Sequence, residues 1–103
     1  ADGKRAVSAS WDSMLKVWDL ENGRELRTLE GHSSWVNSVA VTADGKRAVS
    51  ASDDHTLKVW DLERGICLAA FYADGAMLCC AVIQNNIVAG DAGGRVHFLL
   101  LEE

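Results

Sequence analysis

A nearly identical repeat is the feature of this sequence that most constrains its fold. The residues ADGKRAVSAS at 1–10 recur letter for letter at 43–52, and LKVWDLE at 15–21 recurs at 57–63, so the copies lie 42 residues apart. Short apolar runs alternate with polar, glycine-containing turns throughout both copies. A period near forty residues with strand-like content predicts an array of small β-sheets that bury their apolar faces against one another.

The strand pattern extends beyond the repeat, and no segment has the period of a helix. Val36, Val39 and Val41 belong to the run that we expect to be the most buried strand, since all three side chains are β-branched. Turn signals such as Asn22-Gly23 permit tight reversals between the runs. We therefore expect no helix and about ten strands, at residues 6–10, 14–20, 25–30, 36–42, 47–52, 56–62, 67–72, 77–83, 87–89 and 95–101.

The size and charge of the chain limit its possible partners. With 103 residues, 49% of them hydrophobic, the chain is long enough to bury a small core. Its net charge of −5 disfavours general nucleic-acid binding, which needs clustered Lys and Arg. No apolar run approaches the roughly 20 residues of a membrane span, so we expect no membrane partner. The three cysteines form no CxxC pair, which favours a reducing compartment and a cytoplasmic location.

Several dipeptides carry a resemblance to a known family. Gly31-His32 precedes a predicted strand, Trp18-Asp19 and Trp60-Asp61 lie near the ends of others, and SASWD and SASDD form turns between strands. With these motifs the chain resembles the WD-repeat β-propeller family, whose blades are four-stranded antiparallel sheets set around an axis. The resemblance covers nearly the whole chain and implies an all-β fold, a propeller fragment of about two and a half to three blades.

The expected blade boundaries follow from aligning the units. Residues 1–30 would form a partial blade without its inner strand, 31–72 a complete blade, and 73–103 a degenerate blade without Gly-His and Trp-Asp pairs. A closed ring needs roughly four to eight blades, so we expect the chain to be part of a longer protein. The ending GDAGGRVHFLLLE resembles the closing blade of bacterial WD-repeat proteins, many of which carry an N-terminal signalling domain.

A histidine, a serine and an aspartate in the second unit allow two interpretations. His32, Ser50 and Asp54 are the parts of an activated nucleophile, so a hydrolase is one hypothesis. The family resemblance instead implies a buried structural hydrogen-bond chain through Trp60, Ser50, His32 and Asp54, which would satisfy the polar groups inside the blade. The matching residues of the first unit are Ser8, Asp12 and Trp18. We favour the structural interpretation and expect no catalytic residues.

Two further clusters have simpler explanations than ligand binding. Asp53-Asp54-His55 lies in a predicted two-stranded turn, where adjacent side chains point in different directions, so we expect no metal. Residues 90–94 are glycine-rich as phosphate-binding loops are, but they lack the Gly-Lys-Ser/Thr ending and a following helix. We expect a hairpin turn there and no cofactor in the protein.

Surface recognition is then the expected function. In WD-repeat proteins the usual contact positions lie on loops at one rim, which the resemblance maps to Trp35, Asn37, Asp53 and Trp11. An exposed Trp beside an Asn and an Asp can anchor a peptide or protein; the alternative is that Trp35 packs on its own loop. We therefore expect a non-enzymatic protein-binding scaffold or sensor module of a larger signalling or regulatory protein.

Self-assembly is the remaining alternative. Near-identical units can pair heterologously, and an incomplete arc has two unpaired edges that can close into a ring of copies or grow into a filament. The expected partners are therefore a protein or peptide, the remaining blades of a parent propeller, or further copies of this chain.

Overall fold

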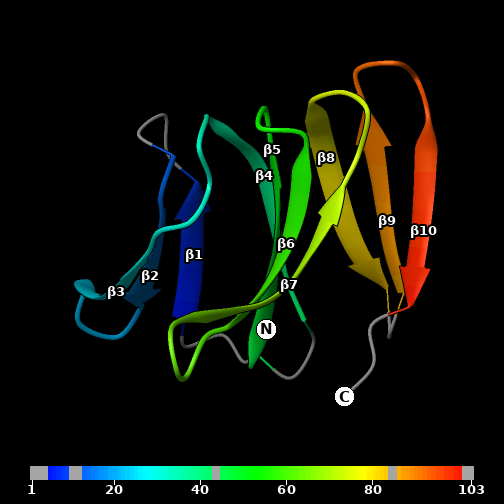
Figure 1. The fold of residues 1–103 in the computed structure, drawn as a ribbon. Helices are drawn as coiled ribbons and strands as arrows, with labels where there is room; N and C mark the ends of the chain where they lie inside the picture. Colours follow the sequence, from blue (N-terminus) through cyan, green and yellow to red (C-terminus); the bar gives the residue numbers. More distant parts are fainter. Residues whose placement is uncertain (1–4, 10–12, 43–44, 84–85, 101–103) are drawn as a thin grey trace.

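The fold is a row of three antiparallel sheets. The computed structural model describes residues 5–9, 13–42, 45–83 and 86–100, and its ten strands stand side by side in these sheets over an extent of 40 × 29 × 18 Å (Figure 1). No described residue lies in a helix. The prediction of an all-β fold with about ten strands is therefore confirmed.

The strands follow one another along the chain with short turns between them. Their bounds are β1 Arg5–Ala9, β2 Leu15–Asp19, β3 Arg24–Leu29, β4 Val36–Val41, β5 Arg47–Ser52, β6 Thr56–Asp61, β7 Ile66–Tyr72, β8 Met77–Ile83, β9 Asn86–Asp91 and β10 Val96–Leu100. The first sheet has the order β1-β2-β3, the second β4-β5-β6-β7, and the third β10-β9-β8. Strands that are consecutive in sequence are thus neighbours in space within every sheet.

The observed strand ends lie within two residues of the predicted ones, and β9 differs most. The sequence suggested a strand at 87–89, whereas β9 extends to Asp91. The reason is that Asp91 pairs with Met77 of β8, and its N–H donates to the Arg95 carbonyl at 3.0 Å. Backbone pairing therefore continues into residues whose side chains are typical of a turn.

The repeated sequence forms the same local structure twice. The β1–β2 hairpin pairs Ser8 with Lys16, and the β5–β6 hairpin pairs Ser50 with Lys58 in the same register. Both hairpins are followed by an irregularity just before the tryptophan of the Trp-Asp pair, where β2 meets β3 and β6 meets β7. A second kind of bulge lies at the start of β4 and of β8. Identical residues thus give identical pairing in both units.

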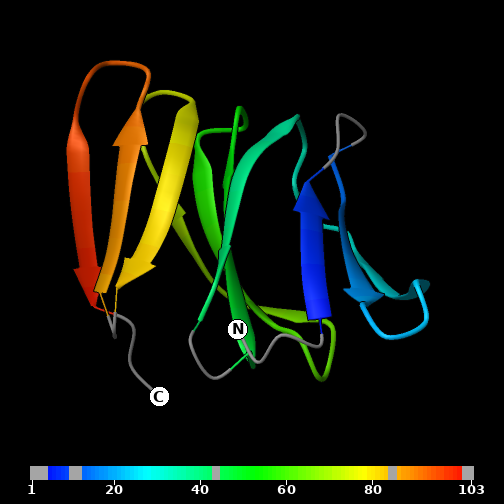
Figure 2. The same cartoon turned by 180° about the vertical axis from the view of Figure 1, so that it is seen from behind.

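The core consists of two apolar clusters, one in each gap between sheets. The cluster between the first and second sheets contains Leu15, Val17, Leu29, Val36, Ala48, Trp60 and Leu62. The cluster between the second and third sheets contains Val49, Ala51, Leu57, Met77, Ile87 and Ala89. Strand β5 is buried on both faces because alternate residues point into the two gaps. The view from behind shows β4 between β1 and β8, which it contacts on either side (Figure 2).

The part of the chain that the structure describes contains no helix with the length and apolar character needed to cross a membrane.

Candidate functional site

The loop before β4 is seated on the tryptophan of β6. A Cβ added to Gly31 would come within 3.0 Å of the Trp60 ring, so only glycine lets the backbone lie this close. The Lys58 ammonium donates to the Gly31 carbonyl at 2.6 Å and holds the loop from the same strand. This seat places the next residue, His32, inside the blade, where its side chain has no exposed surface.

His32 is the centre of a hydrogen-bond chain that joins three segments of the second sheet. Its Nε2 lies 2.5 Å from the Ser50 hydroxyl on β5, and its Nδ1 lies 2.8 Å from an Asp54 carboxylate oxygen in the β5–β6 turn. The Trp60 indole N–H donates to the same Ser50 oxygen at 2.8 Å. The structure thus brings together all four residues that were named for the second unit.

The proton positions in this hydrogen-bond chain follow from the groups at its two ends, the Trp60 indole and the Asp54 carboxylate. The indole N–H of Trp60 can only donate, and the carboxylate of Asp54 can only accept. Ser50 therefore donates its own proton to Nε2 of His32, and Nδ1–H of His32 donates to Asp54. Burial lowers the pKa of His32, and the hydrogen bond to Asp54 offsets this effect only in part. A neutral imidazole satisfies every group in the chain.

The turn around Asp54 strengthens its role as the final acceptor. Burial alone would raise its pKa, but hydrogen bonds from the Thr56 hydroxyl, the His32 ring and the Ser33 backbone N–H hold the pKa at about 2. One carboxylate oxygen accepts from the His32 ring and the Ser33 backbone N–H. The second oxygen accepts from the Thr56 hydroxyl and, at 3.0 Å, from the Thr56 backbone N–H. Among the described residues, no buried side-chain nitrogen or oxygen lacks a hydrogen-bond partner. The carboxylate therefore ties the loop before β4 to the β5–β6 turn.

The hydrogen-bond chain through Ser50, His32 and Asp54 has the donor order of a Ser-His-Asp triad, but a substrate cannot reach its serine as it does in an enzyme. The Ser50 residue has 0% of its surface exposed, and its oxygen already accepts the Trp60 N–H. A nucleophile must reach a substrate carbon with a free lone pair, and a substrate needs room beside it. The arrangement is suited to bracing the blade, because the Ser50 hydroxyl is covered and already bonded to Trp60 and His32.

The first unit shows one half of the same arrangement. The Trp18 indole N–H donates to the Ser8 hydroxyl at 3.0 Å, as Trp60 does to Ser50. Ser8 is exposed, whereas Ser50 is fully buried. The other residues named for this unit, Trp11 and Asp12, lie outside the described residues.

Three of the predicted rim residues meet at the end of the sheet where β4 begins. The Asn37 amide donates to the Asp53 carboxylate at 2.6 Å and to the Met77 carbonyl of the third sheet at 2.9 Å. The Trp35 carbonyl accepts the Asp53 backbone N–H at 2.9 Å and the Ser52 hydroxyl at 2.8 Å. About half of the surface of Trp35, 51%, is exposed. The rim cluster, defined as Trp35, Asn37 and Asp53, is thus an ordered and accessible surface.

The bulge at the start of β4 explains how Asn37 joins this cluster. Val36 pairs with Ser52 and Ser38 with Ala51, so Asn37 is the extra residue that has no partner in the ladder. A bulged residue is turned away from the regular alternation of the strand. The family resemblance placed Asn37 at the rim but did not reveal its bond to the neighbouring sheet.

Sequence reasoning missed a polar pair in the third sheet. The His97 ring nitrogen Nε2 lies 2.9 Å from the buried Asp91 carboxylate, and the ring meets Phe71 of β7 edge-on with centroids 5.3 Å apart. The other Asp91 oxygen accepts the backbone N–H groups of Gly93 and Arg95, so it occupies the donors of the glycine-rich turn. Those groups are not directed at a ligand. The sequence signal that could have predicted this pair is the position of Asp91 and His97 on either side of the glycine-rich turn.

The other clusters considered from the sequence separate in space. In the turn after β5, Asp54 lies inside the blade, Asp53 lies against Asn37, and His55 is exposed. Among the described residues, no three His, Cys, Asp or Glu side chains are grouped as a metal site requires. Cys67, Cys79 and Cys80 are free thiols, and burial raises the pKa of Cys80.

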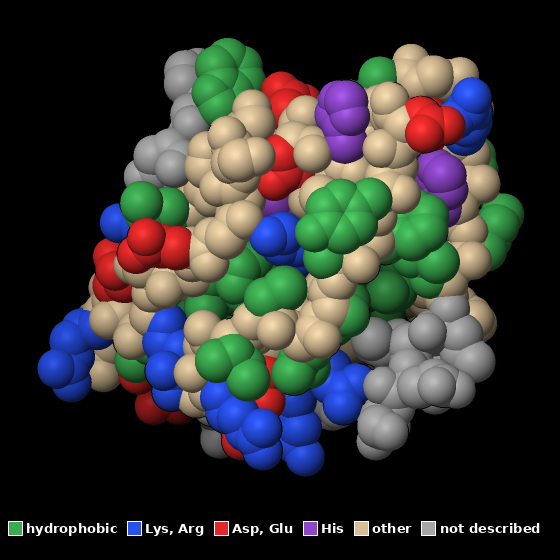
Figure 3. Space-filling model, in the orientation of Figure 1, with side chains coloured by type: hydrophobic (Ala, Val, Ile, Leu, Met, Phe, Trp, Pro, Cys, Tyr) green, Lys and Arg blue, Asp and Glu red, His purple; other side chains and the backbone are tan. Residues whose placement is uncertain are grey.

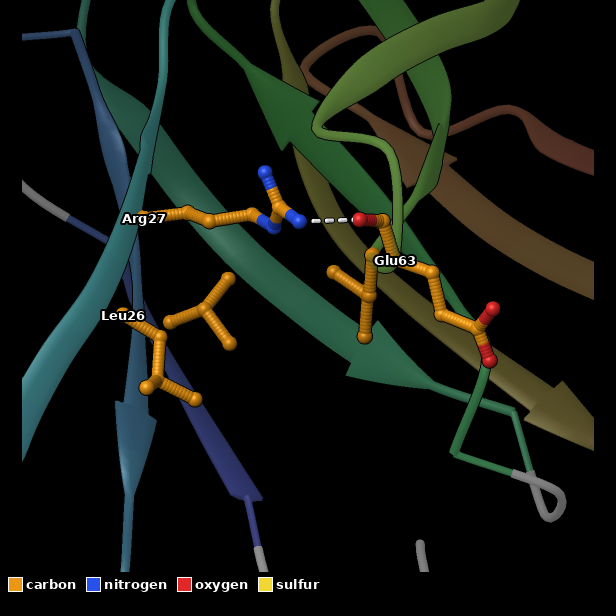
Figure 4. A pocket seen from close by; sticks show the side chains of 5 residues that line it. Leu26, Arg27 and Glu63 are labelled. Atoms are coloured by element: carbon orange, nitrogen blue, oxygen red, sulfur yellow. Dashed lines mark hydrogen bonds between the residues drawn. The ribbon is translucent and has the colours of Figure 1, made fainter.

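A pocket of about 350 Å³ lies between the first and second sheets, at the end opposite the rim cluster. Arg27 of β3 crosses this pocket and donates a guanidinium N–H to the Glu63 backbone carbonyl, while the Glu63 carboxylate points away (Figure 4). Leu26 contributes an apolar wall. The repeat carries no signal for this contact, because the residue 42 positions after Arg27 is Ala69, which has no guanidinium.

Comparison with known proteins gives the family. Residues 1–19 and 23–61, more than half of the chain, match the model described as WD domain, G-beta repeat. A 39-residue segment is 49% identical to the nuclear distribution protein PAC1 of Arthroderma otae, covering 38% of this chain and 8% of that protein. A 36-residue segment is 53% identical to the small ribosomal subunit protein RACK1y of Oryza sativa subsp. japonica, covering 35% of this chain and 11% of that protein. The aligned segments thus span about a tenth of the length of these relatives. The family match, the three meandering sheets and the placement of Gly31-His32 and Trp60-Asp61 together show that the chain belongs to the WD-repeat family.

Proposed function

We propose that this chain is a non-enzymatic module that binds a protein or peptide through the rim cluster. WD repeats are generally protein-interaction scaffolds, which supports this class of function. The net charge of −5 favours a protein partner over a nucleic acid. What supports the rim cluster in particular is a comparison between two sheets of the same chain.

The second and third sheets share one backbone frame at the rim. The bond from the Asp53 N–H to the Trp35 carbonyl, at 2.9 Å, has its counterpart in a bond from the Ala92 N–H to the Ala76 carbonyl, at 2.8 Å. The bulge that contains Asn37 in β4 recurs at the start of β8. The backbone at this rim therefore does not depend on which side chains it carries.

The side chains on that frame differ completely. Where the second sheet has an indole, an amide and a carboxylate, the third sheet has Ala76, Leu78 and Ala92. The third sheet forms the same backbone frame without an indole, an amide or a carboxylate at these positions, so the frame does not require those side chains. An exposed tryptophan flanked by two polar groups is the composition of an interface anchor. This is the single observation on which the proposal rests.

A peptide-display selection on the folded protein tests the proposal. We expect enriched peptides whose affinity falls at least about tenfold for Trp35→Ala, the loss typical of an interface anchor. Tyr72→Ala is the matched control, since Tyr72 is an even more exposed aromatic residue on β7, at 74%, and it should leave affinity unchanged. A selection that yields no binder, or binders that do not distinguish Trp35→Ala from Tyr72→Ala, would contradict the proposal.

The hydrolase hypothesis makes a different prediction. A serine-reactive phosphonate would label Ser50 if that residue were an accessible nucleophile. We expect no adduct at Ser50 in folded protein, because its oxygen is bonded to Trp60 and His32 and its surface is covered.

Self-assembly is a second candidate, favoured by the outward face of the third sheet. Val96 and Phe98 are 59% and 74% exposed, whereas Leu57 and Leu15, which correspond to Val96 in the other two sheets, are 2% and 0% exposed. We propose that a second copy of the chain covers this face. Light scattering should then show a mass above that of the monomer, with one fixed stoichiometry for a ring or continuing growth for a filament.

A charge on that face gives the matched test of self-assembly. Phe98→Asp should return the protein to monomer, while Tyr72→Asp, at an equally exposed aromatic position, should not. A wild-type protein that stays monomeric at high concentration would contradict self-assembly and leave the binding proposal untouched.

The wider setting of the module is also a proposal. We propose that it belongs to a larger cytoplasmic signalling or regulatory protein, supported by three free thiols and by the small share of its relatives that it spans. The rice relative is named as a protein of the small ribosomal subunit, which is itself an assembly. A bacterial origin rests only on the closing stretch of the sequence, and the named relatives are eukaryotic.

A further inference from the structure

The rim cluster presents a biased set of hydrogen-bonding groups. The two hydrogens of the Asn37 amide are used by the Asp53 carboxylate and the Met77 carbonyl. The opposite orientation of the amide would place its oxygen against two acceptors, so the contacts themselves determine which atom is nitrogen. The amide oxygen of Asn37 therefore remains available as an acceptor.

Asp53 contributes acceptors of the same kind. One of its carboxylate oxygens takes the Asn37 bond, and the other makes no hydrogen bond to any described residue. A carboxylate group supplies hydrogen-bond acceptors and no donor. The open polar groups of Asn37 and Asp53 are thus acceptors only. They lie at the same rim as the half-exposed Trp35, whose backbone carbonyl accepts the Asp53 N–H at 2.9 Å.

The charged side chains around the cluster are mostly acidic. The described loops at this end of the sheets contain four carboxylates, of Glu30, Asp53, Asp54 and Asp74, and one guanidinium, of Arg95. That guanidinium is paired with Asp74 at 2.7 Å. The ammonium of Lys58, on β6, is bonded to the Gly31 carbonyl. Most of the visible Lys and Arg side chains lie along the opposite, lower edge of the molecule (Figure 3).

We infer that the rim cluster binds an arginine side chain of the partner, an inference that rests on the proposed function. A guanidinium supplies only donors, arranged in a planar fork that can bond an amide oxygen and a carboxylate oxygen together. Its flat face stacks on an indole through cation–π attraction. An acidic or purely apolar partner residue would leave the acceptors of Asn37 and Asp53 without donors, which is costly once water is excluded.

The test uses two matched peptides, acetyl-Ala-Ala-Arg-Ala-Ala-amide and the same peptide with citrulline in place of arginine. Citrulline keeps the shape and most donors of arginine but has no charge. Binding is followed by NMR at the Trp35 indole N–H, which is assigned from its loss in Trp35→Phe. We expect the arginine peptide to bind about tenfold more tightly than the citrulline peptide, from one exposed ion pair and one cation–π contact together.

Two variants show whether the preference belongs to this cluster. Asp53→Asn should abolish the preference for arginine, because it removes the charge but keeps the shape. Asp74→Asn should retain the preference. It removes a carboxylate from the neighbouring loop, and the Asp74 side chain is 87% exposed and already paired with Arg95. Equal binding of the two peptides, or a preference that survives Asp53→Asn, would overturn the inference.

The result is distinguishable from failure of the binding function itself. Displayed peptides that need Trp35 but tolerate replacement of every arginine by citrulline would overturn the arginine inference and leave the protein-binding proposal standing. A selection without binders, together with no shift of the Trp35 indole signal, would overturn both.

Discussion

Replacing Ser50 by alanine removes the central link of the buried hydrogen-bond chain. Its oxygen is bonded to the Trp60 indole N–H at 2.8 Å and to His32 Nε2 at 2.5 Å, and its surface is fully buried. Ser50→Ala therefore leaves an indole donor and an imidazole nitrogen without partners inside the blade. Each such buried group costs about 1–3 kcal/mol, so we expect a loss of about 2–4 kcal/mol in the free energy of unfolding.

Ser8→Ala is the matched control for this measurement. Ser8 has the same place in the first hairpin and accepts the Trp18 indole N–H at 3.0 Å, but it is exposed, so water can replace the lost bond. We expect a cost below about 1 kcal/mol. Urea unfolding, monitored by circular dichroism and by tryptophan fluorescence, gives the free energy of unfolding of each variant. The dependence of that free energy on urea concentration is compared between the variants. Equal costs for the two serines would refute the claim that the chain around His32 braces the blade.

Three further predictions follow from the described contacts. Because hydrogen bonds outweigh burial and hold the pKa of Asp54 at about 2, below its ordinary value of 3.8, its contribution to stability is present above about pH 4 and is lost as the pH falls toward 2. The stability gap between wild type and Asp54→Asn should therefore narrow by about 2 kcal/mol between pH 5 and pH 2 in urea unfolding, and a constant gap would argue against this pKa. Gly65→Ala and Gly23→Ala both place a Cβ on a residue with φ near +70°, which costs about 1 kcal/mol. Only the Cβ at Gly65 meets Arg27, at 3.3 Å, so Gly65→Ala should lower the melting temperature more than Gly23→Ala. Arg27→Leu should cost about 1 kcal/mol because it removes the guanidinium bond between the first two sheets, whereas Arg24→Leu should be nearly neutral; a similar melting temperature for these two variants would contradict the role of that bond.

The sequence was sufficient to predict the sheets because local signals and the repeat agree with each other. The two copies of RAVSA and of LKVWD form strands with one register, and turns such as the one at Gly23 lie where glycine and asparagine permit a positive φ. The rim positions Trp35 and Asn37 were predicted from a family motif at fixed spacing. Such features depend on residues that are close in sequence or repeated within it.

The contacts that sequence reasoning missed join segments with no repeated signal. Asn37 bonds the Met77 carbonyl, a backbone group that any residue type would supply. Arg27 bonds the Glu63 carbonyl in the same way. The pair of Asp91 and His97 lies in the unit that departs from the repeat, so no second copy points to it. Backbone acceptors leave no mark on the residue types, and their positions are known only once the sheets are in place.

The most direct test of the account is an NMR titration of the folded protein with a peptide obtained in the display selection. We predict that the largest shifts occur at the Trp35 indole N–H, the Asn37 side-chain amide and the Asp53 backbone N–H, while the Trp60 indole N–H inside the blade does not move. Large shifts at Trp60, with the three rim signals unchanged, would contradict the division of this chain into a buried polar brace and a recognising rim.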